Sequence, residues 1–147
     1  MKIFFLLSLL LTFLTSCGKN IESQAKEQVE KTLTELAKNP ESVQISNVET
    51  IFHTDSTCVL HLVFRGQNGF GGYSRENLEY IYALQKSGDI YEGIVNLDDT
   101  ESRVETAKEF YNDNIKKSKS PEELEKWIEG SVGIYVCLHG RKIETAE

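Results

Sequence analysis

Nucleophilic catalysis needs a serine or cysteine beside a base, with a third group that orients the base. The histidines that could act as this base are His53, His61 and His139. Ser74 follows a glycine-rich stretch, but no Gly-x-Ser-x-Gly elbow of a serine hydrolase surrounds it. We therefore expect no catalytic residues of this type.

Two cysteines lie close to histidines along the chain. Cys137 and His139 would share one face of a strand, and Cys58 and His61 could meet across a bend. Packed strands produce such pairs without any catalysis, and we adopt this interpretation. Two cysteines without close spacing do not build a zinc site, so we expect no metal and no cofactor.

Two carboxylates lie inside predicted strands, Glu79 and Glu92. They could face a shared cleft, where burial would perturb their titration. Strand alternation equally allows both to face water. We treat them as surface charge.

A glycine-rich segment separates two predicted strands, Gln67-Asn68-Gly69-Phe70-Gly71-Gly72-Tyr73. Its glycines permit unusual backbone angles and close approach of a partner. We expect either a strand connection whose aromatic residues pack on the core, or a binding loop. The binding loop would use Asn68, Phe70, Gly71, Gly72 and Tyr73.

Two segments carry a resemblance to known proteins, NPESVQISNV at 39–48 and GQNGFGGY at 66–73. They resemble a group of small exported bacterial proteins and lipoproteins with a "DP-S-A-F-NV" segment after a first helix and an "N-x-FGGY" segment after a strand. The resemblance implies an exported domain with this element order, and no particular reaction. Many members have a cysteine where this chain has His61, so no family disulfide is carried over.

The first residues have the plan of a secretory signal, with Lys2 before an apolar run from Ile3 to Leu14. This run is shorter than the about 20 residues of a membrane span. Leu14-Thr15-Ser16-Cys17 resembles the lipobox of bacterial lipoproteins. The resemblance implies removal of residues 1–16 and attachment of acyl chains such as palmitate to Cys17. The alternative is an ordinary signal peptide with a chance cysteine.

Acylation at Cys17 would place the chain on a bacterial envelope membrane without spanning it. Residues 17–20 would form the tether and 21–147 a single domain. Gly18-Lys19-Asn20 lacks an aspartate after the cysteine, which favours the periplasmic face of the outer membrane. In that compartment Cys58 and Cys137 could form a disulfide, or could remain separate buried thiols.

Periodicity predicts a helix over 21–38, closed by Asn39-Pro40, and then four antiparallel strands. The first strand carries a bulge, the second is half buried, the third is covered on both faces, and the fourth spans 90–97. A capping box at Ser102 begins a helix to about Lys117, and Ser120-Pro121 begins a short helix ending at Gly130. Gly133 to Leu138 is predicted as the last strand.

These elements predict an α+β fold, with an N-terminal helix packed on an antiparallel sheet of four to five strands and two helices before a C-terminal strand. Its shape could be cystatin-like or nuclear-transport-factor-like. The net charge of −7 argues against nucleic acid as a partner. We expect a non-catalytic module that binds an envelope protein or a cell-wall component. The alternative is a small hydrolase or transferase with a cleft between helix and sheet.

Overall fold

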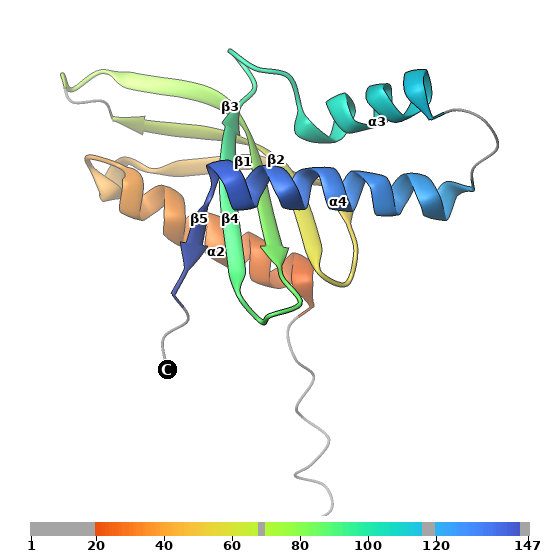
Figure 1. The fold of residues 1–147 in the computed structure, drawn as a ribbon. Coiled ribbons are helices and arrows are strands. Elements are labelled where there is room, and N and C mark those ends of the chain that lie inside the picture. The colour runs from red at the N-terminus through yellow and green to blue at the C-terminus, as the bar shows by residue number, and fades with distance from the viewer. Residues whose placement is uncertain (1–19, 68–69, 116–119, 145–147) are drawn as a thin grey trace, which may run out of the picture.

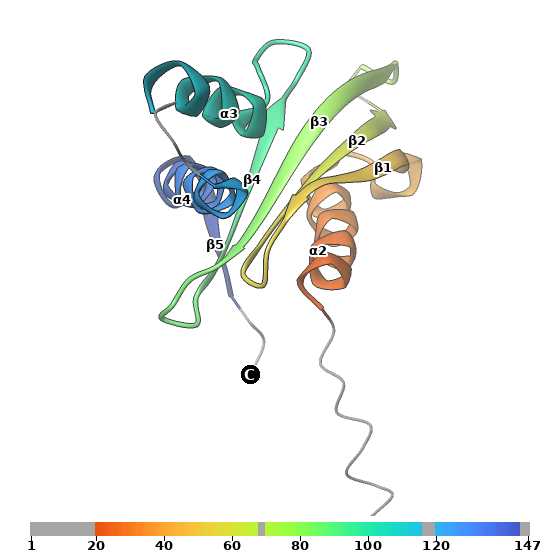
Figure 2. The same ribbon diagram turned by 90° about the vertical axis from the view of Figure 1, so that its right-hand side faces the viewer.

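The computed structural model describes residues 20–67, 70–115 and 120–144. A five-stranded antiparallel sheet with the order β1-β2-β3-β4-β5 forms the middle layer. Helix α2 covers one face of this sheet, and α3 and α4 cover the other (Figure 1, Figure 2). The α+β layout predicted from the sequence is confirmed.

Helix α2 spans Ile21–Leu36, and its N-cap Asn20 accepts a hydrogen bond of 2.8 Å from the amide of Ser23. The spacing of Ala25, Val29 and Leu33 buries one stripe against the sheet. The helix ends at Leu36, two residues before the predicted end. A 3₁₀ turn, η2, follows at Pro40–Ser42.

Strands β1 (Gln44–His53) and β2 (Thr57–Gln67) form the hairpin predicted around residues 54–56. The predicted bulge is present, because the register shifts between Ser46 and Glu49 and again between Thr50 and Phe52. The half-buried assignment of β2 is wrong. Leu60 packs toward α2 while Val59 packs toward α4, so helices cover both of its faces.

Strand β3 (Tyr73–Leu84) lies at the centre of the sheet between β2 and β4 (Ile90–Asn96). Tyr80 faces α2, and Ile81 faces α4. The prediction that this strand is covered on both sides is confirmed. Such a strand has no wet face, so any charged group that it or its neighbours turn inward must be paired.

Helix α3 spans Arg103–Asn114, and its N-cap Ser102 accepts a hydrogen bond of 3.3 Å from the amide of Glu105. The predicted start is confirmed, while the helix ends three residues before Lys117. Val104, Ala107 and Tyr111 form its buried stripe.

Helix α4 is a single element from Pro121 to His139, which corrects two predictions. The helix does not end at Gly130, and residues 133–138 are not a strand. Ile128, Val132 and Val136 repeat every four residues and pack on the sheet. Burying three such side chains stabilises the helix by about 1.5–3 kcal/mol each. This outweighs the cost of Gly130 and Gly133, about 1 kcal/mol each.

The last strand is β5 (Arg141–Ile143), which pairs with β4 after the single residue Gly140. Within the described ranges, no helix is both long and apolar enough to cross a membrane.

Gly140 lets α4 turn directly into β5. A Cβ at this position would lie 2.3 Å from the carbonyl oxygen of Glu92 and 2.5 Å from that of Val136. We expect Gly140→Ala to lower the free energy of unfolding by about 2–3 kcal/mol, because neither backbone atom can move aside easily. Urea denaturation followed by circular dichroism measures the change.

Gly130→Ala is the matched control, since a Cβ there meets open space. Alanine should raise the free energy of unfolding by about 0.5–1 kcal/mol in the helix interior. Equal effects of the two substitutions would contradict the close approach at Gly140.

Candidate functional site

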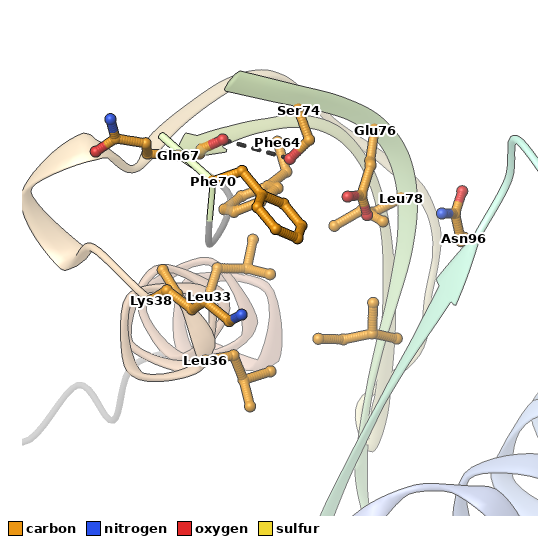
Figure 3. A pocket seen from close by; sticks show the side chains of 13 residues that line it. Leu33, Leu36, Lys38, Phe64, Gln67, Phe70, Ser74, Glu76, Leu78 and Asn96 are labelled. Atoms are coloured by element: carbon orange, nitrogen blue, oxygen red, sulfur yellow. Dashed lines mark hydrogen bonds between the residues drawn. The ribbon is translucent and has the colours of Figure 1, made fainter. Parts of the chain in front are cut away.

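A pocket of about 590 Å³ lies between the C-terminal end of α2 and the sheet (Figure 3). The volume falls within the range of small-molecule sites. Leu33 and Leu36 of α2 form one wall, and Phe64 and Leu78 of the sheet form the other. Phe70, from the glycine-rich segment, lies at the open side of this pocket. Its interior is therefore mostly apolar.

Polar side chains occupy the edges of the same pocket, Lys38, Gln67, Ser74, Glu76 and Asn96. Lys38 follows α2, whereas Glu76 and Asn96 lie on the sheet across the space from the helix (Figure 3). An apolar interior with a few polar groups at its edge suits a ligand that has an apolar part and a hydrogen-bonding part.

Gln67 holds the glycine-rich segment against η2. Its side-chain oxygen accepts a hydrogen bond of 2.8 Å from Asn39, and its amide nitrogen donates one of 2.9 Å to the carbonyl of Gly71. The Gln67 backbone amide also donates to the Ser42 hydroxyl at 2.9 Å. Gly71 has a φ of 83°, which a side chain would disfavour. The two segments that carry the family resemblance therefore meet at the pocket.

The residues of the predicted binding loop do not all contribute to the pocket. Phe70 is fully exposed and lines the pocket, whereas Tyr73 is 63 % exposed and is not among the lining residues. Gly71 supports the Gln67 contact, and Gly72 lies beside it in the chain. Asn68 lies outside the described residues, as does the predicted acylation site Cys17.

Glu92 is predicted from the sequence to be a surface charge. This prediction is wrong, because only 2 % of the residue is exposed. Its carboxylate accepts hydrogen bonds from Thr32 of α2 at 2.7 Å, from Tyr80 of β3 at 2.5 Å and from Arg141 of β5 at 2.5 Å. The bond to Glu92 raises the pKa of the Arg141 guanidinium. Burial, together with Glu92, raises the pKa of Tyr80 well above its ordinary value.

Glu79 is fully buried too, but on the opposite face of the sheet. It accepts hydrogen bonds from the Ser102 hydroxyl and, at 2.7 Å, from the Arg103 amide at the start of α3. His61 lies 3.0 Å from the same carboxylate. A serine triad needs the histidine between serine and acid, whereas here the acid lies between the two. The two carboxylates therefore share no cleft, and Glu79 caps a helix.

The cysteines do not pair, which contradicts the disulfide, and of the two buried thiols that the other alternative expected only Cys58 is buried. Both are free: Cys58 is buried on the α2 side, and Cys137 is exposed on α4, across the sheet. Cys58 and His61 point to opposite faces of β2. Because α4 is a helix, Cys137 and His139 also diverge. The described residues contain no cluster of His, Cys, Asp and Glu that could hold a metal.

Sequence reasoning missed the α2 contribution to the pocket and the role of Arg141. The helical stripe that contains Leu33 was recognised, but only the packed sheet leaves space beside Leu36. No local pattern connects Arg141 with Glu92, which is 49 positions earlier. The sequence placed Asn39 at the end of the first helix and Gln67 at the start of the glycine-rich segment, but it did not predict the hydrogen bond between them.

We expect Glu92→Gln to lower the free energy of unfolding by about 2–3 kcal/mol, because it removes the nearer and buried one of the two carboxylates that pair with Arg141. The loss is smaller than for a fully buried ion pair, since the Arg141 side chain is half exposed. Glu35→Gln is the control. Its carboxylate lies 3.6 Å from the same guanidinium but is half exposed, so we expect a loss below about 0.5 kcal/mol. Urea titration compares them, and equal losses would contradict the assignment.

Thiol labelling tests whether Cys58 and Cys137 are free thiols of different accessibility. Burial raises the pKa of the Cys58 thiol to about 11, so at pH 8 roughly one molecule in a thousand carries the reactive thiolate. We expect a maleimide to label Cys137 at least about a hundredfold faster than Cys58 in the folded protein. Peptide mass spectrometry assigns each label. Protection of both thiols until a reductant is added would instead indicate a disulfide.

Comparisons with known proteins assign no family to this chain. No family model, no curated protein and no solved structure matches the chain.

Proposed function

We propose that this chain is a non-catalytic binding module of the bacterial cell envelope, and that its ligand enters the pocket between α2 and the sheet. The observation that carries the proposal is the apolar interior of this pocket with Phe70 exposed at its open side. An exposed phenylalanine next to an apolar space gains contact area when a ligand fills that space.

The ligand that fits best is an amphiphile with one apolar chain and a hydrogen-bonding head. The chain would lie between Leu36 and Leu78, and the head would reach Lys38, Glu76 or Asn96 at the edge. These polar groups include both signs of charge, which suits a head that both donates and accepts hydrogen bonds. A lipid-like or cell-wall component of the envelope has this chemistry.

The proposed anchor precedes α2 in the chain, whereas the pocket lies at the C-terminal end of this helix. Ile21 begins the helix just after the segment that follows Cys17, whereas Leu36 ends it beside the pocket. Its 16 residues correspond to about 24 Å. With acyl chains on Cys17 in the outer membrane, the pocket would face the periplasm, and its ligand would come from there.

A small hydrolase or transferase is the second candidate. The observation that favours it is a cavity of about 230 Å³, lined by Thr32, Glu92 and Arg141, beside the ligand pocket. The two cavities share Leu36 and Ile94. However, Glu92 already accepts three hydrogen bonds, so it has little capacity left to act as a base.

The proposal predicts that a benzophenone analogue of phenylalanine at position 70 captures the ligand in living cells that make the full chain. The same analogue at position 73 is the matched control, because Tyr73 is exposed in the same segment but does not line the pocket. Mass spectrometry of the purified protein identifies the adduct. We expect one defined amphiphile at position 70 and not at position 73.

A second pair of variants tests the pocket itself. Leu36→Asp places a charge in the apolar interior at a position that is 60 % exposed, so the fold should tolerate it while the adduct disappears. Ile134→Asp, at a position 63 % exposed on α4, should leave the adduct unchanged.

Equal adducts at positions 70 and 73, or none at 70, would contradict the proposal. An adduct that accumulates only in Glu92→Gln protein would favour the enzyme.

A further inference from the structure

Another cavity, of about 380 Å³, lies between α3 and α4 on the face of the sheet opposite the ligand pocket. Figure 2 shows these two helices together on the far side of the sheet from α2. The cavity is lined by one cation, two hydroxyl side chains and three aromatic rings: Arg103, Thr106, Ser131, Phe110, Trp127 and Tyr135. Neither the family resemblance nor the proposed function involves it.

Arg103 is the unusual residue of this cavity. Its Nε is buried and has no hydrogen-bond acceptor among the residues that the structure describes. Its guanidinium carbon lies 5.0 Å from the centre of the Tyr135 ring, which holds it by a cation–π contact. The Glu79 carboxylate accepts a hydrogen bond of 2.7 Å from the Arg103 backbone amide, and no ion pair between Glu79 and the guanidinium is present among the described residues. A buried donor without an acceptor is unfavourable.

Aromatic rings form the other walls. Phe110 and Trp127 stack with their centroids 5.7 Å apart and their planes at 6°. Trp127 is held in place because its indole nitrogen donates to the carbonyl of Ala107 at 3.1 Å. Phe110 remains 52 % exposed, so the stack is open to solvent. Fixed rings beside a cavity favour a flat aromatic guest.

We propose that this cavity binds a flat aromatic ring with a carboxylate attached to it directly or through a short linker. The carboxylate accepts hydrogen bonds from the Arg103 guanidinium, in the two-pronged geometry that arginine favours. The ring lies against Tyr135 and the Phe110–Trp127 pair. A free aromatic acid and a peptide that ends in an aromatic residue share this chemistry.

The test uses 4-fluorobenzoate with the full chain at pH 7. Fluorine NMR follows the probe, and the fluorescence of Trp127, which is the only tryptophan of the chain, follows the cavity wall. We expect saturable binding with a change in both signals. The neutral analogue 4-fluorobenzamide has nearly the same shape and should bind about tenfold more weakly, since it cannot form the charged pair.

Two variants locate the charge. Arg103→Gln should weaken 4-fluorobenzoate about tenfold and leave 4-fluorobenzamide unchanged. Lys108→Gln removes an exposed cation of the same helix that pairs with Glu105 outside the cavity, and should have no effect. Circular dichroism confirms that each variant is folded. If Arg103→Gln does not fold, the affinities of the unaltered chain for 4-fluorobenzoate and 4-fluorobenzamide still test whether the site requires a carboxylate.

Equal affinity for acid and amide, or no saturable binding of either, would overturn the proposal. Peptides ending in Gly-Phe, with a free or an amidated C-terminus, distinguish the two sources. Tighter binding of the free peptide than of 4-fluorobenzoate would assign the site to a chain terminus, and the reverse would assign it to a small acid. Loss of this site would not affect capture at position 70, so the two proposals fail independently.

Discussion

The buried carboxylate of Glu92 connects three elements of the fold. Its hydrogen bonds reach α2 through Thr32, β3 through Tyr80 and the C-terminal strand through Arg141. A carboxylate in an apolar layer is stable only with such partners. The short strand β5, with three residues, has little pairing of its own and depends on this ion pair for its position. Gly140 is required beside it, because the backbone passes too close to Glu92 for a side chain.

The opposite face of the sheet also contains a buried carboxylate, Glu79, but its partners are of a different kind. Glu79 is paired not with an arginine side chain but with the first amide of α3 and the Ser102 hydroxyl. The positive end of a helix replaces a cation there. This arrangement leaves the Arg103 Nε without a hydrogen-bond acceptor among the described residues, and the guanidinium lines the cavity between α3 and α4. Glu92 thus holds the C-terminal strand β5 at the edge of the sheet. Glu79 holds the start of α3, which places Arg103 beside the cavity between α3 and α4.

Much of the fold could be predicted because its patterns are local. The stripe of α2, the bulged β1 and the capping box at Ser102 each depend on neighbouring residues. The prediction failed at α4, where Ile134 to Leu138 reads as a strand by composition. Only packing of Ile128, Val132 and Val136 on the sheet decides for a helix. Of the candidate site, the glycine-rich segment was recognised, and Phe70 lines the pocket. The contacts of Gln67 with Asn39 and Gly71, and the walls from α2, could not be read from the chain.

The sequence by itself determined the order of the first helix and four strands, the central position of β3 and the break between β2 and β3 at the glycine-rich segment, because periodicity and glycine placement act over a few residues. Only the tertiary structure decided that Glu79 and Glu92 are buried on opposite faces, that Cys58 and Cys137 are separated by the sheet, and that Leu36 and Phe70 border one pocket. Strand alternation specifies which residues share a face, but whether that face meets water or a helix depends on elements far away in the chain.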